Sequence, residues 1–481
     1  MYYKTNPFSC IPDTISTSTT TMASSKSTLA DIAVINEDNS IGRLKSVPRC
    51  YFEEYEVLQE QLSLYRQGYL HPVAVTDIIR PDVSISASRA QHAPSGYRIL
   101  HKLGSGGEAT VWLAQELDHL DRAVSLKIFS GHCSSAGERE ARALKACVAS
   151  PNTPGSRHIL SLLDDFNISG PNGTHKVHVT EVVMPLMVLS RLLSPTSKTE
   201  VARDLARGLA HVHHCGFVHG DIHDGNVGCA MPPAFAREKI ADMMSLLSSY
   251  DVTMVIPNNP AFHGPELPHY LLSACELLLV YESYNGLKAH QHAKLYDFGN
   301  ARRAGEETNG TDDVRWAWPP PEAAFAYHGC NKREALPTMA GDIWCLGALI
   351  LRLFTGEWIL HDTSPACLLE QAKLDGVIPA AWREYWDTVA YLRDRSDQVT
   401  HENADVGWSK RRDYFMQKNP NVDVAEVELL ISLLRRMLAT EPEMRLSADE
   451  VLTYPWFAEG FGAPPDGPSP EPCEHNASVK R

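Results

Sequence analysis

Two carboxylates and one amide in this 481-residue sequence stand at spacings that suit phosphate chemistry. The segment His219-Gly-Asp-Ile-His-Asp-Gly-Asn226 places Asp221 five residues before Asn226. Further along, Asp297 follows a short apolar stretch and precedes Phe-Gly. In phosphoryl transfer, one carboxylate accepts or orients the proton of the acceptor hydroxyl, whereas an amide and a second carboxylate hold Mg2+. We therefore expect Asp221 to be catalytic, and Asn226 and Asp297 to be metal ligands.

A glycine-rich turn and a strand lysine precede these residues. Gly104-Ser-Gly-Gly-Glu-Ala109 lies between two strand-like stretches, and its glycines let backbone amides approach phosphates without a side-chain clash. Lys127 follows Gly104 by 23 positions, inside the apolar stretch 123–129. A buried lysine needs a negative partner, which Glu140 in the next helical stretch can provide. Taken singly these signals are weak, since a plain turn and a partly exposed edge lysine give the same pattern.

Histidines crowd the segment from His211 to His223, which raises the alternative of a metal centre. Acidic ligands at metal-binding spacing are missing there, which argues against it. The 11 cysteines are scattered, with no C-x-x-C pair and no Cys/His cluster apparent in the sequence. We therefore expect buried thiols in a reducing compartment, and neither a disulfide framework nor a zinc site.

The patterns around these residues predict an α+β fold. Alternation and apolar runs predict strands over 97–103, 110–114, 123–129, 158–166 and 177–183, with a helix over 138–148. After Pro185 the pattern becomes helical, with a helix over 342–354 and another beginning at Ser447, whose capping box ends at Glu450. The expected architecture is a small β-rich unit followed by a larger, mainly helical one.

The order of these motifs resembles the eukaryotic protein kinases over roughly residues 97 to 461. The glycine-rich hairpin, strand lysine, helix glutamate, D-x-x-x-x-N loop and D-F-G triplet follow the family's sequence. Pro320-Pro-Glu322 is similar to the family's A-P-E, and Asp342-Ile-Trp-Cys-Leu-Gly347 resembles the start of its central helix. Arg445 resembles the arginine that pairs with the A-P-E glutamate, here Glu322. The resemblance implies a bilobal fold that uses ATP and Mg2+.

Within the kinases, the chain looks most like a divergent, fungal-type member of the SR-protein kinase family. The similar stretches are Gln67-Gly-Tyr-Leu-His-Pro72, Thr110-Val-Trp-Leu-Ala114, Leu162-Leu-Asp-Asp-Phe166, Gly170-Pro-Asn-Gly-Thr-His175 and Asp297-Phe-Gly-Asn-Ala301. Moreover, 71 positions separate Asn226 from Asp297, where this family carries a spacer. The resemblance implies transfer of phosphate to protein serine or threonine, with Arg/Ser-rich proteins as candidate substrates.

The resemblance also implies which residues surround ATP. Adenine would lie between the lobes near the linker 181–183, with Thr180 as gatekeeper, and Lys127 held by Glu140 would orient the phosphates. Asp221, Lys127, Glu140 and His223 would form the catalytic set. The nucleotide would be bound by Leu103, Gly104, Ser105, Gly106, Gly107, Val111, Lys127, Thr180, Glu181 and Val183.

The resemblance suggests a division of the chain into five parts. We expect a disordered Ser/Thr-rich leader over 1–46 and an N-terminal extension over 47–96, polar and helix-like at its start. The kinase N-lobe would span 97–184. The C-lobe would span 185–461 and carry the insert at about 228–292, and a flexible tail would occupy 462–481.

Several positions depart from the kinase pattern. Ala109 and Ser125 are conservative changes, whereas Gly220 replaces an arginine that commonly grips an activation-loop phosphate. His223 stands where most protein kinases have a lysine at the γ-phosphate, so we expect slower or more pH-dependent turnover. Pro319 replaces a usual arginine before A-P-E, which weakens the inference of Arg/Ser specificity.

The bulk properties narrow the partners. A formal net charge of -15 argues against nucleic-acid binding and favours basic protein partners, as does the acidic segment 302–315. The start of the chain lacks the pattern of a secretory signal, and its apolar stretches are too short to span a bilayer. We expect a monomer in the cytoplasm, the nucleus or both, without membrane association.

Two other functions stay open at the level of the sequence. The loop from His219 to Asn226 also resembles that of aminoglycoside and choline kinases, although the hairpin, Glu322 and Arg445 favour a protein substrate. Alternatively, Gly220 and His223 would suit a catalytically weak pseudokinase scaffold, which the intact set of five polar residues opposes.

Overall fold

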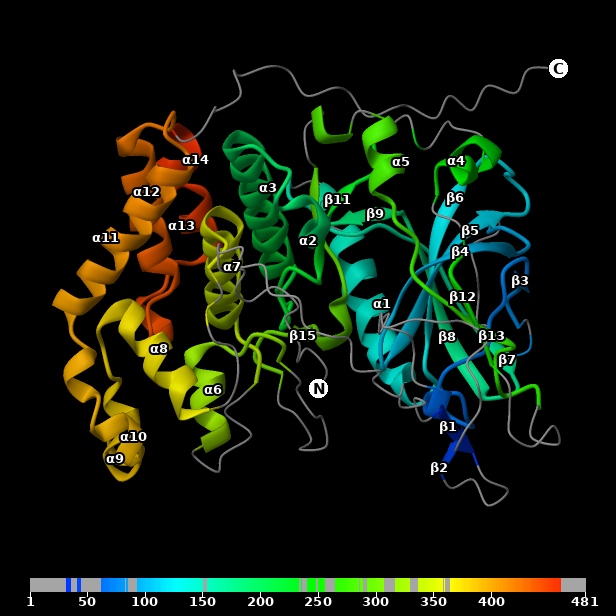
Figure 1. The fold of residues 1–481 in the computed structure, drawn as a ribbon, viewed down its shortest axis with the longest axis horizontal. Coiled ribbons are helices and arrows are strands. Elements are labelled where there is room, and N and C mark those ends of the chain that lie inside the picture. The colour runs from blue at the N-terminus through cyan, green and yellow to red at the C-terminus, as the bar shows by residue number, and fades with distance from the viewer. Residues whose placement is uncertain are drawn as a thin grey trace, which may run out of the picture.

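The fold is that of a computed structural model. It describes residues 32–35, 41–44, 62–82, 84, 93–149, 154–232, 235, 240–247, 250–255, 264–284, 286–288, 292–306, 316–328, 336–357, 359 and 364–459. Figure 1 shows a sheet with one long helix on one side of the molecule and a helical mass on the other. The expected α+β, bilobal kinase fold is thus confirmed.

A six-stranded antiparallel sheet forms the N-lobe, in the order β3-β4-β5-β6-β8-β7. Side chains on its covered face are apolar at alternate positions, so burying that face drives its formation. Lys127 in β6 is paired with Val111 in β5 and with His178 in β8. The strands are β3 Ile78–Ile79, β4 Tyr97–Ser105, β5 Ala109–Glu116, β6 Ala123–Phe129, β7 Leu162–Gly170 and β8 Gly173–Thr180.

The helix α1 (Ser134–Val148) packs against this sheet and carries Glu140. Its covered face consists of small and apolar residues such as Ala141 and Leu144, which let the helix lie close to the strands. Glu140 lies on the same face and is 2% exposed, so the helix delivers a carboxylate into the interior. The helix begins four residues earlier than the sequence pattern predicted.

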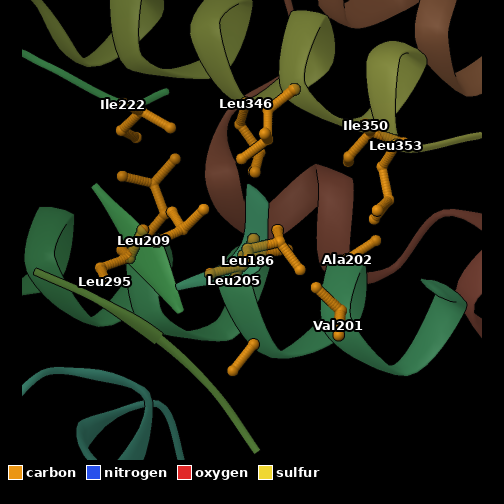
Figure 2. Close-up of a cluster of buried hydrophobic side chains, with 14 of the residues drawn as sticks. Leu186, Val201, Ala202, Leu205, Leu209, Ile222, Leu295, Leu346, Ile350 and Leu353 are labelled. Atoms are coloured by element: carbon orange, nitrogen blue, oxygen red, sulfur yellow. The ribbon is translucent and has the colours of Figure 1, made fainter. Parts of the chain in front are cut away.

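The C-lobe is organised around α3 (Pro195–His214) and α7 (Met339–Thr355). Figure 2 shows the packed side chains between them: Leu205 and Leu209 of α3 lie opposite Leu346 and Ile350 of α7. Ile222 lies in the same cluster and belongs to the loop from His219 to Asn226, called the catalytic loop below. The loop is therefore anchored in the core one residue away from Asp221. The other helices are α2 Leu186–Leu189, α4 Ile240–Leu246, α5 Leu278–Ser283, α6 Pro321–His328, α8 Pro365–Asp375, α9 Arg383–Thr388, α10 Ala390–Arg393, α11 His401–Lys418, α12 Val424–Met437, α13 Ala448–Leu452 and α14 Pro455–Glu459.

Short strands join the lobes. A three-stranded sheet has the order β14-β11-β9, and β10 pairs with β15. The catalytic loop lies between β10 and β11, and Asp297 follows β14, so both chemical segments emerge beside the same small sheet. These strands are β9 Val183–Pro185, β10 Phe217–Val218, β11 Val227–Ala230, β14 Ala293–Leu295 and β15 Arg302–Arg303.

The insert between Asn226 and Asp297 returns to the N-lobe. It contains α4, α5 and a hairpin of β12 (Val252–Met254) with β13 (Tyr270–Leu272). Leu272 lies in the apolar core of the N-lobe sheet, and the hydroxyl of Tyr270 accepts a hydrogen bond of 2.8 Å from the backbone N–H of Val75. The insert and the N-terminal extension therefore cover the N-lobe together.

Some predicted boundaries were wrong. The strand expected over 158–166 begins only at Leu162, because His158 ends a 3-10 turn and its ring is bonded to the Ala293 carbonyl. The strand expected over 177–183 ends at Thr180. The start of the extension, where helical character was expected, lies outside the described residues, and its described part holds a 3-10 turn over Leu62–Leu64 and the strand β3. Within the leader, β1 (Ile32–Ile35) pairs with β2 (Ile41–Leu44), and the tail after residue 459 lies outside the described residues.

Candidate active site

Lys127 is bonded to two carboxylates where the lobes meet. Its Nζ donates to Glu140 Oε2 at 2.8 Å and to Asp297 Oδ1 at 2.7 Å. Burial would lower the pKa of Lys127, but the two negative neighbours outweigh burial and raise it above its ordinary value. Lys127 is thus held as a cation by α1 on one side and by the segment after β14 on the other.

Asp297 has an unusual backbone conformation. Its φ of 62° and ψ of 70° lie in the left-handed region, which costs an aspartate energy unless its surroundings enforce it. The next residue, Phe298, is fully buried, and its ring lies 4.5 Å from that of His219. Burial would raise the pKa of Asp297, but Lys127 reverses this and lowers it. The carboxylate is therefore ionised, and 43% of the side chain stays exposed.

Asp221 is oriented by three neighbouring groups. Asn226 Nδ2 donates to Asp221 Oδ2 at 3.1 Å and to the Asp221 carbonyl at 2.9 Å. The backbone N–H of Ala317 donates to Asp221 Oδ1 at 3.2 Å. His223 Nε2 lies 3.7 Å from Asp221 Oδ2. The structure thus brings the predicted acid and amide together and fixes the direction in which the carboxylate faces.

His223 stands beside the carboxylate and is mostly buried. Its ring also lies 5.9 Å from that of Trp318. Burial would lower the pKa of His223, but Asp221 and other nearby carboxylates raise it above its ordinary value. The backbone N–H of Gly225 donates to His223 Nδ1 at 3.0 Å, so this nitrogen carries no proton in the structure, and the imidazole must give up this bond to become a cation.

Asp342 fastens the catalytic loop from the first turn of α7. Its two oxygens accept the backbone N–H groups of His219 and Gly220, each at 2.8 Å. His213 Nε2 lies 3.0 Å from Asp342 Oδ2, and the Asp342 side chain is fully buried. From the sequence Asp342 was predicted only as part of a helix. Its anchoring role depends on two segments more than 100 residues apart and had no local signal.

Gly220 has a φ of +80°, so its replacement of the family's arginine has a conformational basis here. A Cβ at this position would lie 2.9 Å from Pro337 Cγ and 3.1 Å from the Asn300 carbonyl oxygen. We expect Gly220→Ala to lower the free energy of unfolding by about 1–3 kcal/mol. Urea unfolding measures this change.

Gly216→Ala is the matched control for that prediction. Gly216 has a φ of +77°, and no atom of the described residues lies within 4 Å of a Cβ built there. It therefore carries the backbone cost without the crowding. Equal losses of stability in the two variants would contradict the crowding at Pro337.

The glycine-rich hairpin forms between β4 and β5. Gly104 is paired with Val111, and Ser105 with Thr110, while the Gly106 N–H donates to the Ala109 carbonyl at 2.9 Å. A Cβ built at Gly104, Gly106 or Gly107 meets no atom of the described residues within 4 Å. The hairpin therefore leaves open space beside its backbone. Leu103 packs against the main core.

The linker after β8 is held by ionic contacts. Thr180 Oγ1 donates to the Glu181 carbonyl at 3.2 Å. The Glu181 carboxylate accepts from the Ser161 N–H and from Lys294 Nζ, each at 2.8 Å. Its side chain is thus engaged with neighbouring segments, so a nucleotide would meet Glu181 through the backbone. Val183 opens β9.

The residues around Lys127 suit ATP with Mg2+, which the fold family uses. Asp297 has one oxygen on Lys127 and a partly exposed carboxylate, and Asn226 lies in the loop that faces it. A carboxylate and an amide are oxygen donors of the kind that Mg2+ prefers. The open backbone of the hairpin would suit phosphates. The donor set therefore fits this pair of ligands.

The ion pair between Arg445 and Glu322 lies apart from Lys127, and one cluster of cysteine and histidine was not predicted from the sequence. Arg445 donates to both carboxylate oxygens of Glu322, at 2.9 and 2.7 Å, as predicted from the sequence. The expectation of no Cys/His cluster is wrong, because the fold brings Cys147, His211 and Cys215 together. The spacing from His211 to Cys215, one helical turn, was the only signal in the sequence.

Comparison with known proteins gives a consistent picture. The protein kinase domain family matches residues 283–457. A serine/threonine protein kinase of Aspergillus fumigatus is 25% identical over 424 residues, covering 84% of this chain and 91% of the relative. SRSF protein kinase 3 of Homo sapiens is 31% identical over 196 residues, covering 38% of this chain and 32% of the relative. Serine/threonine-protein kinase SKY1 of Saccharomyces cerevisiae is 32% identical over 187 residues, covering 35% of this chain and 23% of the relative.

The fold and the site define a protein kinase. With these matches, the chain is a serine/threonine protein kinase, and part of it is similar to the SRSF protein kinases. Among the described residues, no helix combines the length and apolar character needed to cross a membrane.

Proposed function

We propose that this kinase transfers the γ-phosphoryl group of ATP to serine or threonine hydroxyls of basic, Arg/Ser-rich proteins. The observation that carries the chemistry is Lys127 bonded to both Glu140 and Asp297, with Asp221 oriented by Asn226 in the neighbouring loop. In kinases this lysine–glutamate pair and the metal-binding aspartate must both be in place for transfer.

Each side chain has a distinct part in the proposed reaction. Lys127 orients the α- and β-phosphates, and the hairpin backbone over Gly104–Gly107 covers them. Asp297 and Asn226 hold Mg2+, which neutralises phosphate charge when bound. Asp221 accepts the proton of the substrate hydroxyl. At the same time the hydroxyl oxygen bonds to the γ-phosphorus, and the bond from that phosphorus to ADP breaks. When it is protonated, His223 beside Asp221 supplies positive charge next to the transferring group.

A basic substrate is supported by charge and by the relatives. The chain carries a formal net charge of -15, which attracts basic partners. Three similar proteins, from Homo sapiens, Mus musculus and Sus scrofa, are named SRSF protein kinase 3. Acidic side chains between the arginines of the segment 302–315 would add local negative charge near the acceptor site, although the residues from 307 onward lie outside the described residues. We also propose that this kinase acts as a monomer in the cytoplasm, the nucleus or both.

Phosphotransfer to defined acceptors tests this function. Purified full-length protein is incubated with ATP and Mg2+ and offered an Arg/Ser repeat peptide, a Lys/Ser peptide of equal charge, an acidic Ser peptide, choline and an aminoglycoside. Preferred phosphorylation of the Arg/Ser peptide supports the proposal. Preference for choline or the aminoglycoside would favour a small-molecule kinase. Magnesium-dependent ATP binding without transfer to any acceptor would favour a pseudokinase.

His223→Lys is expected to raise kcat at neutral and alkaline pH. The pKa of His223 is raised, so its charge is complete at acidic pH and is lost as the pH rises through that value. Lysine keeps its charge over this range, so the rate of the variant relative to wild type should grow with pH, to about tenfold. The measurement is a pH–rate profile of kcat.

His214→Lys is the control for this profile. His214 ends α3 and contacts Asp449 at the surface, away from Asp221. Its variant should follow the wild-type profile. A ratio for His223→Lys that is independent of pH would show that the charge at position 223 does not act on the reaction.

A further inference from the structure

Three potential metal ligands converge between the lobes, outside the proposed ATP site. Cys147 lies in the last turn of α1, His211 lies in the last turn of α3, and Cys215 caps that helix. Two sulfurs and one imidazole nitrogen all lie within 4.8 Å of one another. Cys215 Sγ is 3.7 Å from His211 Nε2. Distant parts of the chain thus present soft donors to one point.

The distance of 3.7 Å between Cys215 Sγ and His211 Nε2 matches that of a zinc site, and the third donor lies within 4.8 Å of both. With Zn–S of about 2.3 Å and Zn–N of about 2.0 Å, tetrahedral geometry places sulfur and nitrogen about 3.6 Å apart. We propose that Cys147, His211 and Cys215 bind Zn2+ or a similar soft divalent ion, with water as the fourth ligand. Two thiolates and one imidazole select such ions over Mg2+, which prefers oxygen donors.

The surroundings of the cluster set the conditions for binding. Cys147 is 1% exposed, and burial raises the pKa of its thiol to about 12. Binding must therefore displace the thiol protons, so affinity should rise with pH. His211 Nε2 is now 2.8 Å from the Cys147 carbonyl oxygen, so binding replaces this contact and places the imidazole proton on Nδ1. Cys215 is only half-buried, which gives ions and water access.

The position of the cluster ties it to the kinase machinery. Cys147 lies two helical turns after Glu140 on α1, and Cys215 stands six residues before Asp221. An ion held by both segments would fix the end of α1 against the end of α3. It would therefore stabilise the arrangement in which Glu140 meets Lys127, without touching the substrate.

Cobalt titration of the full-length protein tests the proposal. The protein is prepared without metal, with its thiols reduced and without nucleotide, and is titrated with Co2+, whose thiolate complexes absorb in the near ultraviolet. We expect one Co2+ per chain with a thiolate band, displaced by Zn2+. Oxygen ligands such as Asp297 cannot give this band, so the result is independent of phosphotransfer and of the function proposed above.

Variants assign the band to the three residues. Cys147→Ser, Cys215→Ser and His211→Gln should each weaken Co2+ binding by at least about tenfold, the loss typical of a disturbed metal site. Cys275→Ser, a half-buried cysteine of the insert, should bind as wild type does. Circular dichroism checks the fold of each variant, and Zn2+ should raise the melting temperature of wild type and of Cys275→Ser, but not that of the three ligand variants. A folded wild-type protein without the band, or a band unchanged in the cysteine variants, overturns the proposal.

Discussion

Asp221→Asn is expected to lower kcat by about 10³-fold while the protein stays folded. Asp221 is the carboxylate that the loop aims with Asn226 and the Ala317 N–H. Asparagine keeps the shape and one acceptor oxygen but cannot take a proton, and loss of a positioned general base costs about 10²–10⁴ in rate. Steady-state phosphotransfer to an Arg/Ser peptide at saturating ATP measures kcat. The KM for ATP should change little.

Asp224→Asn is the matched control in the same loop. Asp224 is paired with Arg352 at 2.8 Å and accepts no proton in the proposed reaction, although its charge helps to raise the pKa of His223. The same substitution there removes a charge of the same sign from the same segment. A similar loss of kcat in both variants would assign the effect to loop electrostatics and contradict a base at Asp221.

Asp297→Asn is expected to reduce kcat/KM for ATP by about 10³-fold and to abolish its dependence on Mg2+. The variant loses the anionic oxygen that faces the metal site and also the partner of Lys127 at 2.7 Å. Asparagine tolerates the left-handed backbone conformation of this position, so the turn before Phe298 should persist. Phosphotransfer rates and binding of a fluorescent ATP analogue, each over a range of Mg2+ concentrations, measure the two effects.

Asp165→Asn provides the control for the metal dependence. Asp165 is an N-lobe carboxylate that pairs with Lys145 and Lys176, away from the site. Its variant should keep the wild-type response to Mg2+. Tight, Mg2+-dependent nucleotide binding by Asp297→Asn would contradict the assignment of Asp297 as a metal ligand.

The sequence correctly predicted the elements whose formation depends only on neighbouring residues. The strand β6 was predicted to the residue, because apolar side chains on both of its faces and a turn at each end define a buried strand. The capping box at Ser447 and Glu450 formed as predicted, because it needs only one helical turn. The predicted ends of elements were wrong where contacts with distant residues set them. An example is His158, whose ring is hydrogen-bonded to the Ala293 carbonyl.

The candidate site divides in the same way. Residue types and order in the chain singled out Lys127, Glu140, Asp221, Asn226 and Asp297. Their contacts could not be derived locally, because Lys127 and Asp297 are 170 positions apart and meet only when the lobes pack. The same holds for the anchoring of the catalytic loop by Asp342 and for the return of the insert to the N-lobe.

The sequence by itself determined that this chain has the order of parts of a protein kinase, since that order depends on residue types and local periodicity. Only the tertiary structure decided that Lys127 is held by two carboxylates, that His223 lies beside Asp221, and that Cys147, His211 and Cys215 converge. The physical reason is that distance, burial and electrostatic field depend on which distant segments pack together, and local patterns do not encode them.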